Sequence, residues 1–405
     1  MQNLNKNVRL MNNADKILSK MLSTLEDNIL RFWLDKMIDR EQGGFYGRMR
    51  ADGVVERDAP KGAILTGRIL WSMSAAYRIT QNPEYLDAAT HAKRFLLDKL
   101  YDKEFGGVYW SVEADGTPLD TKKQFYALGF AIYGLSEYVR ATGDEEALSY
   151  AIRLYDAIEE HSHDRRYGGY IEATTRQWGE IEDMRLSTKD RNDRKSMNTH
   201  LHIIEPYANL LRVWRSDELV ESVCGLLDTF EKHIIDSETS HLRLFFDDEW
   251  QSQSDMVSYG HDIEAAWLLI EAAQVVGDEA LIDHFGKIAQ RIAAAAAEGL
   301  NADGSMSYEY TPSSGERDDD RHWWVQAESV VGYYYMWHLF GDTEALARAT
   351  AAWEYIDREI IDREGGEWWW SRKADGTINR TDDKAGFWKC PYHNSRMCIE
   401  LLQTM

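Results

Sequence analysis

One pattern recurs along the chain and limits its possible fold more than any other feature. A Gly-Gly pair in an acidic and aromatic segment, followed by Ala-Asp-Gly, occurs at residues 39–53, 102–116 and 362–376. Its first half occurs again at 164–170, and the first three copies are about 63 residues apart. Two weaker copies, at 242–247 and 302–308, fill the gap before the last one. The chain is therefore predicted to contain six units of about 63 residues.

Each unit combines a β-hairpin with helices. The glycine-rich turns and the aromatic residues between them predict a short hairpin. Helical periodicity covers, among others, residues 64–79, 124–142, 258–276 and 279–298, and Gly143 and Gly277 are expected to end two of these helices. Only 6 prolines are present, which permits many uninterrupted helices.

Two helices in each of six units predict twelve helices and an all-α fold. We expect an (α/α)6 barrel with short β-hairpins in the connecting loops. An open solenoid of helix pairs is the competing arrangement, but a solenoid needs polar terminal caps and neither terminal unit resembles one. No linker or low-complexity segment divides the sequence, so a single catalytic domain over residues 1–405 is predicted.

Charge and cysteine content limit the possible partners. The formal net charge is −23, which argues against nucleic acid or an anionic membrane surface as a partner, and the 3 cysteines are too few for a disulfide framework. Residues 1–6 are polar and lack the apolar core of a signal peptide, and no segment approaches the length of a membrane span. A cytoplasmic protein is expected, either a monomer or a weak homo-oligomer.

Histidines provide the first candidate functional groups. His200 and His202 lie two residues apart on a predicted helix, so their side chains point about 200° apart and at most one can face the barrel axis. They cannot form a metal site of the i,i+4 type. A buried, hydrogen-bonded histidine is the simpler interpretation, whereas the functional one places one of them beside Asn198 in the cavity.

His261 and Glu264 are i,i+3 neighbours on another predicted helix. A carboxylate beside an imidazole raises the pKa of the imidazole and fixes its tautomer, which suits a general base that works near neutral pH. An ordinary surface ion pair has the same spacing and remains the alternative.

Three further residue groups suggest a sugar site. Trp324 and Glu328 share a helix face and could hold a sugar ring and its hydroxyls, although a core tryptophan with a solvated glutamate is equally consistent. Pro391 places Trp388 and His393 on a turn that enters the last helix. Finally, Arg68 lies on an otherwise apolar helix, where a cation costs several kcal/mol unless it is paired or used.

Motifs for common cofactors do not occur in the sequence. No Gly-x-Gly-x-x-Gly follows a predicted strand, and there is no Walker loop, Cys-x-x-Cys pair or His-Glu-x-x-His motif. No cofactor and no metal site are predicted. Acid–base chemistry by histidine, glutamate and arginine is the expected mechanism.

Several of these segments together resemble one known family. Residues 61–71, 184–187, 198–202, 260–264 and 389–394 resemble the N-acylglucosamine 2-epimerase superfamily, in particular its cellobiose 2-epimerase branch, and the resemblance runs nearly from end to end. It implies an (α/α)6 barrel and an isomerase of carbohydrate metabolism. Such an enzyme inverts C2 of the reducing-end aldose of β-1,4-linked disaccharides such as cellobiose, without a cofactor and through a cis-enediolate.

The resemblance also implies roles for individual residues. His261 and His393 would be the two acid–base groups, and His393 would also assist ring opening. Arg68 and His202 would stabilise the enediolate oxygens, which is electrostatic stabilisation of developing negative charge. Glu264 would orient His261. The residues expected to bind the sugar are Tyr126, Asp190, Asn198, Trp267, Trp324, Glu328 and Trp388.

Three alternatives remain open. Thr66-Gly67 before Arg68 and Ala127-Leu128 after Tyr126 depart from the usual pattern of the cellobiose branch, so a mannose 2-epimerase acting on free mannose or glucose is the first alternative. The second is a glycoside hydrolase of the same fold, with Glu328 and Asp190 as its two carboxylates. The third is a protein that binds the sugar without converting it.

Overall fold

The computed structural model describes residues 19–187 and 190–404. Residues 1–6, whose polarity contributed to the expectation of a cytoplasmic protein, lie outside the described residues. Among the helices of the described part, none is both long and apolar enough to cross a lipid bilayer.

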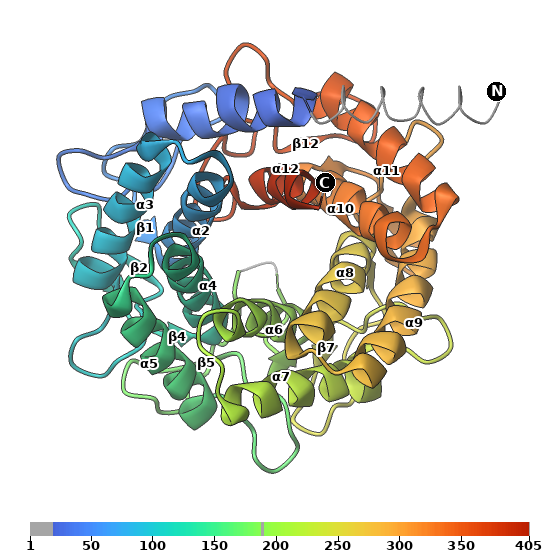
Figure 1. The fold of residues 1–405 in the computed structure, drawn as a ribbon, viewed down its shortest axis with the longest axis horizontal. Coiled ribbons are helices and arrows are strands. Elements are labelled where there is room, and N and C mark those ends of the chain that lie inside the picture. Colours follow the sequence, from blue (N-terminus) through green and yellow to red (C-terminus); the bar gives the residue numbers. More distant parts are fainter. Residues whose placement is uncertain (1–18, 188–189, 405) are drawn as a thin grey trace.

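Six inner helices form a closed ring around the axis of the molecule (Figure 1). They are α2 (Ala63–Thr80), α4 (Phe125–Thr142), α6 (Met197–Leu211), α8 (Tyr259–Val276), α10 (Trp323–Phe340) and α12 (Tyr392–Gln403). Each inner helix contacts the next one, and α12 contacts α2 again. This last contact closes the ring, so the predicted barrel is confirmed and the open solenoid is excluded.

An outer ring of helices covers the inner one (Figure 1). It contains the helical residues 19–37, with the π-helical segments η1 (Thr24–Leu30) and η2 (Trp33–Met37), followed by α3 (Pro83–Phe95), α5 (Glu145–His161), α7 (Asp217–Thr229), α9 (Glu279–Ala296) and α11 (Thr343–Tyr355). Short segments extend four of these helices: η3 (Leu96–Leu100), η4 (Phe230–Ile234), η5 (Ala297–Gly299) and η6 (Ile356–Ile360). Gly143 and Gly277 adopt the left-handed conformation directly after α4 and α8, as expected of helix-terminating glycines.

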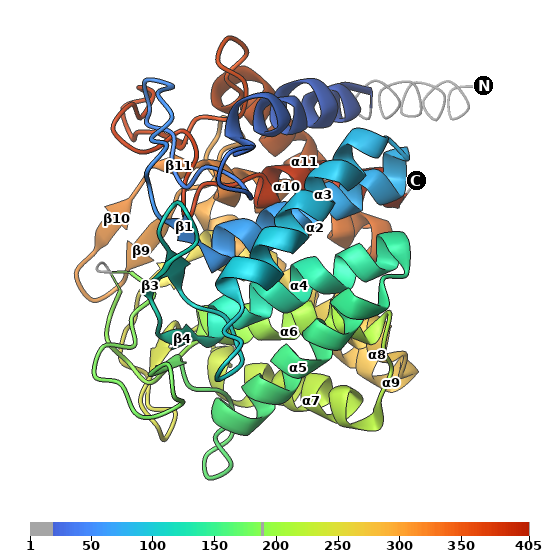
Figure 2. The same cartoon turned by 90° about the vertical axis from the view of Figure 1, so that its left-hand side faces the viewer.

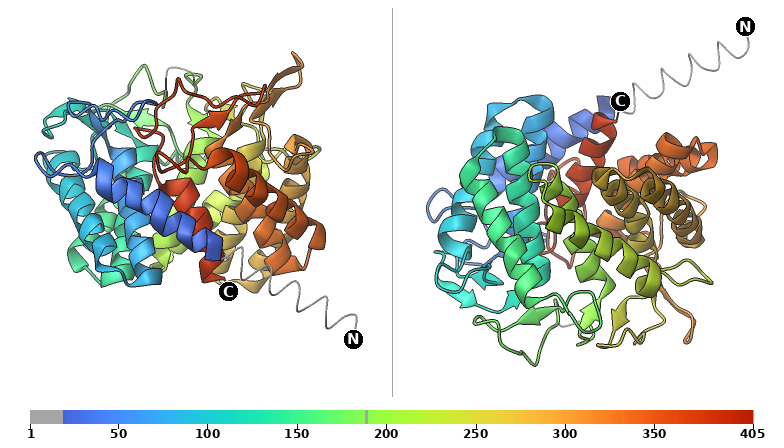
Figure 3. Two further views of the ribbon diagram at one scale, coloured as in Figure 1. Left: turned by 90° about the horizontal axis from the view of Figure 1, so that it is seen from above. Right: turned by 60° about the horizontal axis from the view of Figure 1, so that its bottom comes forward.

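The predicted hairpins close one end of every unit. Each outer helix is followed by one equivalent antiparallel bridge, and the six bridges join Ile38 to Phe45, Tyr101 to Val108, His163 to Tyr170, Ile235 to Leu242, Leu300 to Met306 and Ile361 to Trp368. The fourth and fifth bridges belong to the two weaker copies of the repeat. All six predicted units are therefore present, and their hairpins gather at one end of the barrel (Figures 2 and 3).

Short strands join neighbouring units at this end. They are β1 (Lys61–Gly62), β2 (Ser111–Val112), β3 (Pro118–Asp120), β4 (Lys123–Gln124), β5 (Ala173–Thr174), β6 (Lys195–Ser196), β7 (Phe245–Phe246), β8 (Val257–Ser258), β9 (Glu309–Thr311), β10 (Glu316–Asp318), β11 (Arg321–His322) and β12 (Ser371–Arg372). The strands that directly precede an inner helix (β1, β4, β6, β8 and β11) each pair with a strand of the following unit. The pairing therefore fixes where each inner helix begins relative to its neighbour.

A buried ion pair stabilises several of the hairpins. The aspartate before the Gly-Gly turn accepts a hydrogen bond from the lysine that precedes the inner helix, as in Lys123 Nζ to Asp102 Oδ2 at 2.9 Å. The same contact joins Lys61 to Asp39 and Lys195 to Asp164. Both side chains of the Lys123–Asp102 pair are 0% exposed, and burial lowers the pKa of Lys123 to about 8 despite its ion pair.

Replacing Asp102 by asparagine is expected to destabilise the fold strongly. Asparagine keeps the Oδ1 acceptor of the turn but removes the negative charge that pairs with the partly exposed Arg176 and with Lys123. Lys123 is left as a buried charge without its carboxylate, which costs about 3–5 kcal/mol. Urea denaturation of Asp102→Asn should show this loss in the free energy of unfolding. Adding Lys123→Met should recover most of it, and a double variant as unstable as the single one would contradict the explanation.

Candidate active site

Equivalent positions on the six inner helices line the barrel axis near the hairpin end. The strand pairing aligns the starts of the inner helices, so residues at the same position in each helix correspond to one another. For α12 the count begins at its N-cap, Pro391. The sixth residue of each helix then lies at the same depth. These residues are Arg68, Phe130, His202, Glu264, Glu328 and Arg396. His261 and His393 occupy the third position, one turn closer to the hairpins. The repeat therefore brings distant parts of the sequence to one depth in the barrel.

Arg68 is a buried cation with no counter-ion among the described residues. It is 3% exposed, and its Nη2 donates to the hydroxyl of Tyr126 at 2.7 Å. Its guanidinium carbon lies 4.1 Å from the ring centre of Phe130 and 4.7 Å from that of Tyr392. The Nε atom has no hydrogen-bond partner in the described protein. Since no carboxylate neutralises this charge, it is available to stabilise a negative charge on a ligand.

His202 faces the same region and is held by a carboxylate. Its Nδ1 lies 2.9 Å from Glu205 Oε2, and an ionised carboxylate can only accept, so Nδ1 carries the proton. The α6 backbone departs from helical geometry at His202, where Pro206, four residues later, has no N–H to donate to its carbonyl. His200 is structural: its Nε2 accepts from the Tyr170 amide at 2.9 Å. This confirms that only one of the two histidines faces the axis.

His393 lies in the first turn of α12, whose N-cap is Pro391, rather than on the turn before the helix where it was predicted. Its Nδ1 is 2.7 Å from Glu328 Oε1, and the other oxygen of Glu328 accepts from Trp267 Nε1 at 3.0 Å. Burial, followed by the positive charges of Arg68 and Arg396, holds the pKa of His393 well below its usual value. The ring is therefore neutral at neutral pH. Its Nε2 lies on the side of the ring opposite Nδ1, the nitrogen that Glu328 holds.

His261 requires a correction. We expected Glu264 to orient it and to raise its pKa, but His261 Nδ1 bonds to Ser258 Oγ at 2.8 Å. Glu264 contacts Arg396 instead, with Oε1 2.5 Å from Nη2, because a full positive charge on the neighbouring helix α12 binds the carboxylate more strongly than a neutral imidazole does. Burial lowers the pKa of His261 to about 3, so this ring is also neutral near pH 7.

Two expected sugar contacts do not fit the structure. Trp267 and Glu328 are both 0% exposed, and they lie behind His393 as a hydrogen-bonded support. Trp324 lies beside both histidines: its ring centre is 4.7 Å from that of His261 and 5.5 Å from that of His393. One indole thus borders both histidines.

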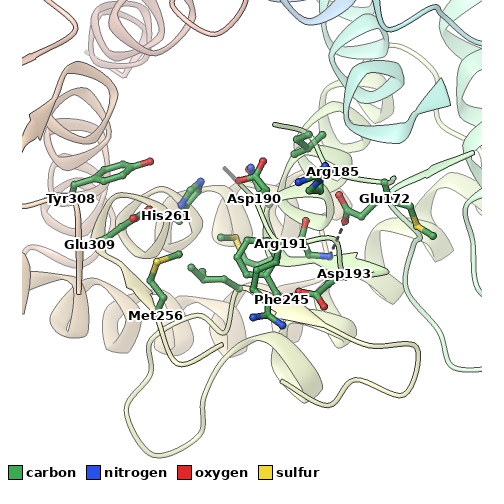
Figure 4. Close-up of a pocket in the computed structure, with 16 residues that line it drawn as sticks. Glu172, Arg185, Asp190, Arg191, Asp193, Phe245, Met256, His261, Tyr308 and Glu309 are labelled. Carbon is green, nitrogen blue, oxygen red and sulfur yellow. Dashed lines mark hydrogen bonds and ion pairs between the residues drawn. The ribbon is translucent and has the colours of Figure 1, made fainter. Parts of the chain in front are cut away.

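Other expected residues surround these groups. Trp388 is half-buried, and its ring centre lies 6.1 Å from that of Tyr126. Tyr126 is the residue whose hydroxyl accepts from Arg68. Asp190, Asn198 and His261 line a pocket of about 130 Å³, together with Tyr308 (Figure 4). The Oδ1 atom of Asn198 has no hydrogen-bond partner among the described residues. Unsatisfied buried polar atoms are costly, and a bound ligand would satisfy this one.

Sequence reasoning missed three residues behind the histidines: Glu205, Tyr392 and Arg396. All three are buried and hydrogen-bonded to one another. Glu205 and Arg396 each follow a site histidine by three residues, and this spacing was the only available signal in the sequence. The pairing of Tyr308, which stacks on His322 at a ring separation of 4.0 Å, was not predicted either.

One group of side chains could in principle bind a metal ion. Among the described residues, ligand atoms of Glu264, Glu328 and His393 lie within 4.8 Å of one another. However, Arg396 Nη2 bonds to both carboxylates. The guanidinium therefore already supplies the positive charge that a metal ion would bring, and the arrangement is an ion-pair network.

Comparison with known proteins identifies the family. The family model described as N-acylglucosamine 2-epimerase (GlcNAc 2-epimerase) matches residues 44–396. The cellobiose 2-epimerase of Bacteroides fragilis is 58% identical over 389 residues, which cover 96% of this chain and 99% of that protein. The solved structure of cellobiose 2-epimerase from Bacillus thermoamylovorans matches with a TM-score of 0.92 at 40% identity, covering 96% of this chain and 100% of the other. A D-mannose isomerase of Marinomonas mediterranea is 23% identical, covering 94% of this chain and 95% of that protein. The chain therefore belongs to the N-acylglucosamine 2-epimerase family of carbohydrate-isomerising enzymes.

Proposed function

We propose that this chain is a 2-epimerase that inverts C2 of the reducing-end aldose of cellobiose and related β-1,4-linked disaccharides, without a cofactor. The observation that carries the proposal is the pair of neutral imidazoles, His261 and His393, which both lie beside the indole of Trp324. The unpaired cation of Arg68 lies beside them. The relatives named cellobiose 2-epimerase, which match nearly the whole chain, support the choice of substrate.

Inversion at C2 requires a proton to leave one face of the carbon and another to arrive at the opposite face. In the proposed mechanism, His393 assists opening of the sugar ring, and one neutral imidazole accepts the C2 proton. The electrons of the C2–H bond then form the C1–C2 double bond of a cis-enediolate. Arg68 stabilises the negative charge on its oxygens, and His202, whose Nε2 is unprotonated, accepts a hydrogen bond from the hydroxyl that remains on the enediolate. The second imidazole takes up a proton from solvent and donates it to the other face of C2, and the first imidazole releases the C2 proton to solvent.

The pocket beside His261 supports a disaccharide substrate. It adjoins the reacting groups and is lined by Asp190, Asn198 and Tyr308, which offer hydrogen bonds and an aromatic ring (Figure 4). Sugar rings are recognised by this combination of aromatic surface and a few well-placed polar groups. We place the glucosyl ring that does not react in this pocket.

The sequence departures that favoured a monosaccharide have a packing explanation. A Cβ atom on Gly67 would lie 2.6 Å from the carbonyl oxygen of Phe130, and one on Gly129 would lie 2.3 Å from that of His202. Thr66 bonds to the carbonyl of Gly62, and Leu128 is fully buried. These positions serve close contacts between α2, α4 and α6, so they carry no argument about the sugar.

Incubation with cellobiose in D₂O tests the proposal directly. We expect 4-O-β-glucosyl-mannose with deuterium at C2 of the reducing sugar, because the proton that returns comes from groups in exchange with solvent. Mass spectrometry and proton NMR measure both changes, and glucose and mannose serve as parallel substrates. Release of free glucose would favour a hydrolase, and an epimerised product without solvent label would contradict the proton-transfer mechanism.

A further inference from the structure

Arg396 occupies a central position in the site without facing the cavity. It lies one turn after His393 on α12 and is 0% exposed. Its Nη2 contacts Glu264 Oε1 at 2.5 Å and Glu328 Oε1 at 2.7 Å, and its Nη1 contacts Glu205 Oε1 and the Tyr392 hydroxyl. One planar guanidinium thus joins carboxylates from three other inner helices. A lysine could not reproduce these contacts, since it carries a point charge without the fork geometry.

Two of these carboxylates are the ones that hold the histidines. Glu205 uses its other oxygen to bind His202 Nδ1, and Glu328 binds His393 Nδ1 through the oxygen that also contacts Arg396. Among the described residues, the only other ion-pair partner of either carboxylate is Arg396. Both histidine anchors therefore depend on the same positive charge.

The charge of Arg396 also decides the protonation state of these anchors. Burial disfavours an ionised Glu205, but the positive charge of Arg396 and the bond from His202 bring its pKa down to about 2. For Glu328, burial raises the pKa above its usual value, and the positive charge and hydrogen bond of Arg396 oppose this rise. Burial and the negative charge of Glu328 raise the pKa of Glu264 well above the usual value. The titratable or charged groups that face Arg396 are Glu205, Glu264, Glu328, Glu400, Tyr133, Tyr392, His202 and His393.

A protonated carboxylic acid would donate to Nδ1 instead of accepting from it. The imidazole would then take the opposite tautomer and present N–H, rather than a lone pair, to the substrate. We propose that Arg396 is a positioning residue that keeps Glu205 and Glu328 ionised together, and thereby fixes the tautomer and orientation of both His202 and His393. The expected effect on catalysis rests on the proposed epimerase function. The expected effect on the two histidine rings does not.

The kinetic test compares Arg396→Lys with wild type on cellobiose. We expect kcat to fall by about 10²-fold with KM nearly unchanged, because misplacement of reacting groups by about 1 Å has this effect. The acid limb of the pH profile of kcat should move to higher pH, since carboxylates that have lost the bidentate cation ionise only at higher pH. Arg140→Lys is the matched control: Arg140 joins Glu137 to Asn209 at the opposite end of α4, and its replacement should leave the profile unchanged.

A second readout does not depend on substrate. Nitrogen-15 NMR of histidine-labelled protein should show His202 and His393 protonated at Nδ1 in wild type, with assignments from His202→Gln and His393→Gln. Arg396→Lys should shift both rings toward the Nε2–H tautomer, and circular dichroism confirms that the variant is folded. Wild-type tautomers and a wild-type pH profile in folded Arg396→Lys would overturn the proposal. Changed tautomers in a protein that never converts cellobiose would instead contradict the proposed function alone.

Discussion

Replacement of His261 or His393 by glutamine is expected to lower kcat for epimerisation by about 10²–10⁴-fold, with KM for cellobiose changed only a few-fold. Glutamine has a similar size but cannot accept a proton, so binding is retained while proton transfer is lost. Both rings lie beside Trp324, and both are neutral because burial lowers the pKa of each.

The two variants should also differ from each other. With one base missing, each variant should still exchange the C2 hydrogen of one epimer with solvent, and the two variants should act on opposite epimers. Solvent exchange in D₂O, measured with cellobiose and with glucosyl-mannose, therefore assigns each histidine to a face of C2. His284→Gln on the outer helix α9 is the control. A wild-type kcat in either variant would refute its role, and exchange of both epimers by both variants would refute the two-base mechanism.

Replacement of Arg68 by methionine is expected to lower kcat by about 10²–10³-fold, which is the usual effect of removing one group that stabilises an oxyanion. The free energy of unfolding should stay the same or rise. Arg68 is buried among Phe130, Tyr126 and Tyr392 without a carboxylate partner, so the folded state bears the cost of desolvating its charge. A protein that keeps such a charge gives up stability for activity.

Steady-state kinetics and urea denaturation of Arg68→Met provide the two measurements. Arg68→Lys, which keeps the charge but not the planar fork, should fall between methionine and wild type in kcat. Replacement of Arg396 by methionine is the matched contrast, because Arg396 is paired with three carboxylates and its loss should destabilise the fold. A large loss of stability in Arg68→Met with little change in kcat would show that Arg68 has a structural role.

Much of the fold could be predicted because it follows from local and repeated signals. The spacing of the Gly-Gly turns predicted six units, and equivalent bridges occur even at Ile235–Leu242 and Leu300–Met306, where the motif had degenerated. Helical geometry alone predicted that His200 and His202 could not both face the axis. The apolar helix around Arg68 predicted its burial. Each of these inferences depends on residues close together in the sequence.

The misassigned residues have partners that are far away in the sequence. Glu264 contacts Arg396, 132 residues later, and Arg396 also contacts Glu205, 191 residues earlier. Spacing along one helix predicts which side chains share a face, but it does not predict which side chain of a neighbouring helix meets them. Here the neighbour is α12, and it meets α2 only because the ring closes.

The sequence by itself therefore determined the number of units, the helical pairs and the residue types at the axis. The tertiary structure decided which carboxylate holds which histidine, and it placed Trp267 and Glu328 behind His393 rather than against the sugar. The physical reason is that electrostatic partners in a buried site are selected by distance and desolvation across helices, and these quantities exist only once the barrel has closed.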